Sequence, residues 1–166
     1  LETAVPLALS IGDTGVTPRV SAIQSSGARV LVVDDEIIVR RLMQEILTVQ
    51  FGCRVDVASQ GMEALELLAE NDYALVVSDI RMPGMSGLEL QHSLRMHGVK
   101  LPVIVITAHG DVAAARQAFL AAATDFIEKP FSPERFIETA QRALEKRVLS
   151  MAVEDLRAQL QQKIGR

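Results

Sequence analysis

The chain has 166 residues, of which 49% are hydrophobic and 23% charged, so it is long and apolar enough to fold around a core and differs from a disordered protein. A net charge of −4 argues against direct binding of nucleic acid by this segment. The single cysteine, Cys53, excludes an internal disulfide, and no apolar run reaches the roughly 18 residues of a membrane span, so we expect a cytoplasmic protein without membrane contact.

The first 28 residues are interrupted by glycine and proline and are rich in serine and threonine, which predicts an arm or linker. Short apolar pieces at Val16 and at 20–23 are able to dock on a folded surface. We expect the organised domain to span residues 29–147, followed by a helical extension at 148–166 that leads toward an output domain absent from this chain.

From residue 29 onward, short apolar runs alternate with helical patterns. Strands are predicted at 29–33, 53–58, 74–77, 103–106 and 125–128. Helices are predicted at 37–49, 61–70, 86 to about 97, 111 to about 123, and 132 to about 163. Ser86 with Glu89, and also Asp111 and Ser132, are the expected helix caps. This alternation predicts an α/β fold with a five-stranded parallel doubly wound sheet of order 2-1-3-4-5, flavodoxin-like, with an extended C-terminal helix.

Polar side chains follow four of the predicted strands at the same carboxyl edge. The first strand is followed by Asp34 and Asp35, and the others end at Asp79, Thr107 and Lys129. Each of these residues alone has an ordinary reading as a solvated strand-end residue. Together they provide three carboxylates that suit Mg²⁺, a nucleophile, and donors for phosphoryl oxygens. The convergence therefore predicts a phosphoryl-transfer site.

Four stretches of the chain resemble the receiver domain of two-component response regulators. They are Val-Leu-Val-Val-Asp-Asp-Glu, Ser-Asp-Ile-Arg-Met-Pro-Gly-Met-Ser-Gly, Val-Ile-Val-Ile-Thr-Ala-His-Gly-Asp and Asp-Phe-Ile-Glu-Lys-Pro-Phe. The resemblance covers residues 29 to about 144. It implies that Asp79 accepts a phosphoryl group from a sensor histidine kinase, and that Thr107 and Lys129 hold the phosphoryl oxygens.

The same resemblance implies roles for further residues. Asp35, Asp79 and the backbone carbonyl of Arg81 are expected to bind Mg²⁺ directly, with Asp34 acting through water. Phe126 is the expected switch aromatic, and the Lys129-Pro130 bond is expected to be cis. The side chains of Arg81 and His109 are expected to tune dephosphorylation, although His109 taken alone is better interpreted as a solvated loop histidine. Met82 and Met85 are expected to pack the loop, and Cys53 to be inert.

The last predicted helix continues beyond the end of a typical receiver. Leu149, Val153, Leu156 and Leu160 recur at spacings of 4, 3 and 4, which is a short heptad pattern. Two compatible interpretations follow: a helical linker to an output domain, and a homodimer in which these helices pair. The competing interpretation is that apolar pieces of the N-terminal arm cover the pattern in a monomer.

Two other functions compete with a phosphorylated signalling module. A phosphohydrolase of the haloacid dehalogenase superfamily uses a similar residue set, but it places an Asp-x-Asp motif after its first strand, where this chain has adjacent Asp34 and Asp35. A degenerate receiver acting as a scaffold conflicts with the complete set of five site residues. We therefore expect no ordinary enzyme activity beyond slow hydrolysis of the chain's own aspartyl phosphate, and an output in transcriptional regulation.

Overall fold

The computed structural model describes residues 22–24, 26–81, 84–86, 89–90, 92–93, 101–108, 110–111, 113, 116 and 125–164. Five parallel strands form one sheet in the order β2-β1-β3-β4-β5, which confirms the predicted fold class. The strands are β1 (Arg29–Val33), β2 (Arg54–Ala58), β3 (Leu75–Asp79), β4 (Val103–Thr107) and β5 (Asp125–Glu128). The longer helices within the described ranges are α3 (Ile37–Phe51), α4 (Gly61–Glu70) and α7 (Pro133–Ile164).

The helix ends follow the predicted capping chemistry. Gly52 adopts a left-handed conformation with φ of 63°, and its N–H donates to the carbonyl of Thr48, so α3 ends there, two residues later than predicted. Ser86 and Glu89 form the predicted capping box, in which each backbone N–H donates to the other's side chain at 2.9 and 3.1 Å. The predicted helices at 86–97 and 111–123 fall largely outside the described residues.

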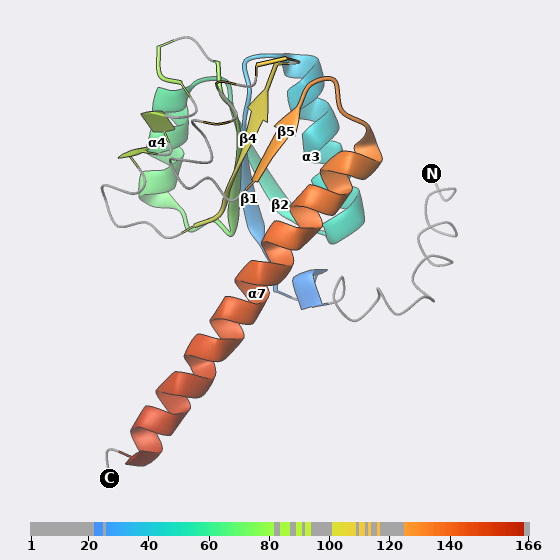
Figure 1. Cartoon of the computed structure of the whole chain (residues 1–166). Helices are drawn as coiled ribbons and strands as arrows, with labels where there is room; N and C mark the ends of the chain where they lie inside the picture. Colours follow the sequence, from blue (N-terminus) through green and yellow to red (C-terminus); the bar gives the residue numbers. More distant parts are fainter. Residues whose placement is uncertain are drawn as a thin grey trace.

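The sheet is covered on both faces (Figure 1). On one face, alternate residues of the strands pack against α3 and the first part of α7. On the other face, the intervening residues pack against α4 and Leu90. Because both faces of a parallel sheet are buried, its central strands are mostly apolar, as β3 is from Leu75 to Val77 and β4 from Val103 to Ile106. The charged residues are therefore displaced to the edges where strands end.

The C-terminal helix α7 has two different halves (Figure 1). Its first half is buried against the sheet through Phe136, Ala140 and Leu144. Its second half runs beyond the amino edge of the sheet, and every residue from 149 to 164 is exposed. Leu149, Val153, Leu156 and Leu160, the residues of the predicted heptad pattern, are 45–65% exposed and are called the α7 stripe below. No helix in the described ranges is long and apolar enough to cross a membrane.

The residues just before β1 pack onto the domain. Residues 22–24 are helical, and Ile23 is buried in the core on the same face as α3 and α7. The backbone of Ala28 accepts a hydrogen bond from the N–H of Arg54 at 3.0 Å, which extends the pairing of β1 with β2. Ile23 is thus part of the domain core. Val16 and Val20 lie outside the described residues.

Candidate functional site

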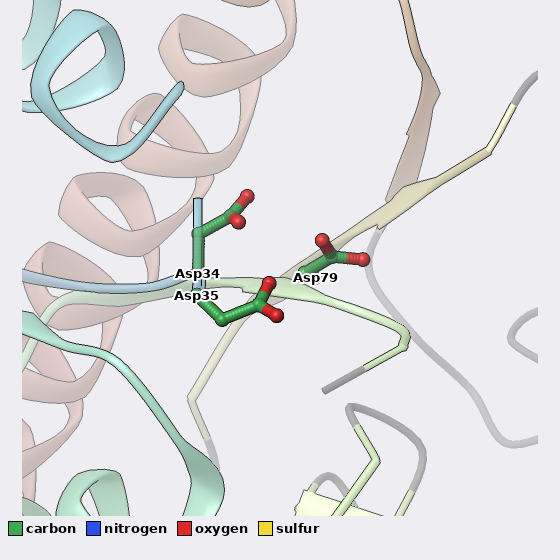
Figure 2. Close-up of side chains that lie close together, drawn as sticks. All are labelled: Asp34, Asp35 and Asp79. Atoms are coloured by element: carbon green, nitrogen blue, oxygen red, sulfur yellow. The ribbon is translucent and has the colours of Figure 1, made fainter. Parts of the chain in front are cut away.

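Three carboxylates meet at the carboxyl edge of the sheet. Asp34 and Asp35 follow β1, and Asp79 is the last residue of β3. Because β1 and β3 are neighbours in the sheet, these side chains converge, and one oxygen from each lies within 4.8 Å of the others (Figure 2). The structure therefore brings together the three carboxylates that the sequence places after separate strands.

Asp34 is the most deeply buried of the three. Its side chain is 0% exposed, and its Oδ1 accepts a hydrogen bond from the N–H of Glu36 at 2.8 Å. Its Oδ2 is buried without a hydrogen-bond partner among the described residues. Burial raises the pKa of this carboxyl to about 6, the nearby charge of Asp79 adds to the rise, and the Glu36 N–H and Lys129 oppose it.

Lys129 brings the positive charge of the site. Its Nζ donates to Asp79 Oδ2 at 2.8 Å and to Glu36 Oε1 at 2.6 Å, and lies 3.4 Å from Asp34 Oδ2. Burial alone would lower the pKa of this ammonium group, but its hydrogen bonds to Asp79 and Glu36 and the charge of Asp34 raise it overall. Lys129 is therefore charged at every physiological pH, and it points at the carboxylate of Asp79.

Thr107 and Phe126 occupy the neighbouring strands β4 and β5. Thr107 is the buried last residue of β4, and its carbonyl accepts a hydrogen bond from the N–H of Lys129 at 2.7 Å. Phe126 is half-buried against the core on the α4 side of the sheet and pairs in register with Val105 of β4. The Lys129-Pro130 peptide bond is cis, as predicted.

The loop after β3 is held against both Asp79 and α4. The N–H of Arg81 donates to Asp79 Oδ1 at 3.1 Å, while its guanidinium binds the carboxylate of Asp111. Met85 packs beside Gly61, where an added Cβ would lie only 2.7 Å from the Met85 Cβ, so glycine allows this close approach. Met85 thus fills the loop as predicted. His109 and Met82 lie outside the described residues.

The sequence analysis missed two contacts of the site. Glu36 is a direct partner of Lys129, and Asp111 is a direct partner of Arg81. A signal for Glu36 was available, because it extends the acidic run that follows β1. Asp111 was assigned only as a helix cap, and its pairing with Arg81 spans 30 residues of sequence. Cys53 is buried, and burial raises the pKa of its thiol to about 11, as suits an inert cysteine.

The donor set of this site fits a divalent cation. The acidic cluster, defined as Asp34, Asp35, Glu36, Asp79 and Lys129, has carboxylate oxygens at its centre and only one ammonium group. Clustered oxygen ligands suit Mg²⁺, and the unpartnered Oδ2 of Asp34 is a buried acceptor that such an ion or its water would satisfy. The three aspartates could therefore hold a metal ion.

A family model described as "Response regulator receiver domain" matches residues 30–141 of the chain. The chain belongs to this family. The receiver is 41% identical over 133 residues to the C4-dicarboxylate transport transcriptional regulatory protein DctD of Rhizobium meliloti, covering 80% of this chain and 29% of that protein. It is 40% identical over 134 residues to the transcriptional regulatory protein FixJ of the same organism, covering 78% of this chain and 65% of FixJ. The receiver thus spans only part of these transcriptional regulators.

Solved structures agree with this assignment. The receiver superposes on NtrX from Brucella abortus in complex with ADP with a TM-score of 0.72 at 37% identity, covering 78% of this chain and 30% of that one. It superposes on the FixJ-N structure with a TM-score of 0.66 at 41% identity, covering 71% of this chain and 94% of that one. Receiver domains of response regulators are signalling proteins, and DctD and FixJ are transcriptional regulatory proteins.

Proposed function

We propose that this receiver accepts a phosphoryl group on Asp79 from the phosphohistidine of a sensor histidine kinase, in a reaction that requires Mg²⁺. The observation that carries the proposal is the 2.8 Å hydrogen bond from Lys129 Nζ to Asp79 Oδ2, inside the acidic cluster, where the same Nζ also contacts the carboxylates of Asp34 and Glu36. Asp79 is 7% exposed, so its carboxylate is largely buried but not fully enclosed.

The chemistry follows from the residues that surround Asp79. A carboxylate oxygen of Asp79 attacks phosphorus, the bond from phosphorus to the histidine nitrogen breaks, and an aspartyl phosphate forms. Lys129 donates hydrogen bonds to the transferred oxygens and replaces its ion pair with Asp79 by one with the phosphoryl group. Asp35, Asp79, the carbonyl of Arg81 and, through water, Asp34 would hold Mg²⁺, which when bound would neutralise part of the developing negative charge.

Phosphorylation is proposed to act on output through Thr107 and Phe126. Thr107 lies at the end of β4 beside the strand that carries Lys129, so its hydroxyl is placed to turn toward added phosphoryl oxygens. Phe126 is half-buried on β5, and its burial is proposed to change when Thr107 moves. The face built by the predicted helix at 111 to about 123, β5 and α7 is then the two-state element that phosphorylation biases.

An apolar patch beside the acidic cluster suits the kinase. Ile37, Ile38 and Leu42 lie on the first turns of α3, directly after Glu36, and Ile38 is 79% exposed. Large apolar side chains gathered next to a reactive site indicate a protein-binding surface. We therefore assign this end of α3 to docking of the kinase domain that carries the phosphohistidine.

The α7 stripe supports a homodimer. Its four residues are exposed in the single chain, and water contact with apolar surface costs about 25 cal/mol per Å². Ile23, the described part of the competing arm, is buried in the core and does not cover the stripe. Pairing of two α7 helices about a twofold axis would bury it and extend toward an output domain, which is proposed to regulate transcription as the relatives do.

Labelling with acetyl phosphate and Mg²⁺ tests the acceptor. We expect one acid-labile phosphoryl group per chain, detected by intact mass, and none in Asp79→Asn. The matched control is Asp72→Asn, an exposed aspartate near the opposite end of the same strand, which should label like the wild type. Undiminished labelling of Asp79→Asn, or repeated turnover of p-nitrophenyl phosphate as in a phosphohydrolase, would contradict the proposal.

A further inference from the structure

The loop that follows β4 is tied to the two neighbouring strand ends by side-chain carboxylates. On one side, the N–H of Gly110 donates to Glu128 Oε2 at 2.8 Å. On the other side, Asp111 Oδ2 accepts from Arg81 Nε at 3.1 Å and from Arg81 Nη2 at 2.7 Å. The second contact links this loop to the residue whose backbone binds the acceptor, so it lies within reach of the reaction.

Asp111 determines where the Arg81 guanidinium lies. The side chain of Arg81 is 73% exposed, so packing does not fix its direction, whereas Asp111 is 15% exposed and better held. The backbone N–H of Arg81 is anchored on Asp79 Oδ1 at 3.1 Å, which places the base of this cation beside the acceptor. Lys129 is the cation that contacts the Asp79 carboxylate, at 2.8 Å, whereas the Arg81 guanidinium binds Asp111 at 2.7 Å.

Phosphorylation of Asp79 would give the Arg81 guanidinium a second anionic partner besides Asp111. A phosphoryl group adds three strong acceptor oxygens and close to two negative charges beside the backbone of Arg81. A guanidinium binds such oxygens through two parallel N–H donors and prefers them to a single carboxylate oxygen. Asp111 and the phosphoryl group therefore compete for one cation.

We propose that Asp111 is a positioning residue that holds Arg81 off the phosphoryl group and thereby shortens the lifetime of the aspartyl phosphate. In hydrolysis, the oxygen of water bonds to phosphorus, the bond from phosphorus to the Asp79 oxygen breaks, and the carboxylate is restored. The protons of the water pass to the released inorganic phosphate and to solvent. Arg81 bound across the phosphoryl oxygens would obstruct the approach of this water, and Asp111 prevents that arrangement. The inference rests on the proposed function of Asp79.

The lifetime of the phosphorylated full chain tests the inference. The chain is labelled with acetyl phosphate and Mg²⁺, the donor is removed by desalting, and the remaining acyl phosphate is followed by intact mass. Asp111→Asn should lengthen the half-life by about two- to fivefold, the ratio that corresponds to an exposed ion pair. In an Arg81→Ala background, Asp111→Asn should have no effect, because no guanidinium remains to be released.

A matched ion pair elsewhere provides the control. Asp125 binds Arg142 at 2.7 Å at the surface near the opposite edge of the sheet, so Asp125→Asn should leave the half-life unchanged. The role of Asp111 would be overturned if Asp111→Asn left the half-life unchanged, or if it lengthened the half-life equally in the wild-type and Arg81→Ala backgrounds. Either result would leave the proposed function of Asp79 intact. Failure of the wild-type chain to label at all would overturn the proposed function and this inference together.

Discussion

The two ends of the β-sheet both contain partly buried ionic groups, but they are built in opposite ways. Near the amino ends of the strands, Arg29 donates to Asp56 Oδ2 at 2.8 Å, and the hydroxyl of Tyr73 donates to the same oxygen at 2.6 Å. The Arg29 guanidinium also lies 5.4 Å from the centre of the Tyr73 ring. Here one cation meets one anion, and the charges balance without any outside ion.

The acidic cluster at the carboxyl ends does not balance. Four carboxylates gather there with one ammonium group, and one carboxylate oxygen of Asp34 has no hydrogen-bond partner among the described residues. A balanced and hydrogen-bonded cluster stabilises the fold, whereas an unbalanced one is unfavourable until a cation reduces its surplus negative charge. The difference separates the part of the sheet that maintains the fold from the part that we propose reacts.

The largest effect on the free energy of unfolding is expected from removing the negative charge of Asp34. Because the pKa of Asp34 is raised from 3.8 to about 6 in the folded chain, folding is favoured while this group is protonated and loses stability as pH rises from about 4 to about 6. In EDTA at pH 7.5, Asp34→Asn should therefore be more stable than the wild type by about 3 kcal/mol. At pH 4 the two should unfold alike in urea.

Mg²⁺ gives the control for this first prediction. Added Mg²⁺ should stabilise the wild type at pH 7.5 more than it stabilises Asp34→Asn, since binding to the folded state adds to its free energy of unfolding. If Asp34→Asn were less stable than the wild type at pH 7.5 in EDTA, the negative charge of Asp34 would not destabilise the fold and the prediction would be wrong.

Tyr73→Phe should lower the free energy of unfolding, by less than Asp34→Asn raises it. The change removes the hydrogen bond from the Tyr73 hydroxyl to a charged carboxylate, which is worth about 2 kcal/mol. The loss should be constant from pH 5 to 9, because burial and the bond to Asp56 raise the pKa of Tyr73 to about 12. Urea unfolding measures the loss, and unchanged labelling of Asp79 would show that the two ends of the sheet are separate in function.

Truncation after Ser150 is expected to have the smallest effect on the fold. Residues 151–164 are exposed along α7, so the domain should keep its free energy of unfolding to within about 0.5 kcal/mol. Sedimentation should show that the full chain dimerises and the truncated chain does not. A full chain that stays monomeric at tens of micromolar, with or without phosphodonor, would remove the α7 dimer.

The sequence predicted the sheet and the gathering of Asp34, Asp35, Asp79 and Lys129 because these depend on local patterns. Apolar runs give the strands, and parallel topology brings their carboxyl ends to one edge. The contact of Lys129 with Glu36 was not predictable in this way, since it joins side chains 93 residues apart whose rotamers depend on the whole site. Ile23 was expected only to be able to dock on a folded surface, because the glycine and serine around it hide any period that would assign it to the core.

The continuity of α7 has a mechanical consequence. Residues 149–164 extend about 24 Å past the domain at 1.5 Å per residue, and no glycine or proline interrupts them. Such a helix amplifies a small rotation of its buried part. A tilt of about 5° near Leu144, where the helix is packed on the domain, moves the far end by roughly 2 Å. Displacements of about 1–2 Å are enough to repack helix interfaces. A tilt of α7 that is too small to disturb its packing on the sheet is therefore large enough to change the contacts of its far end.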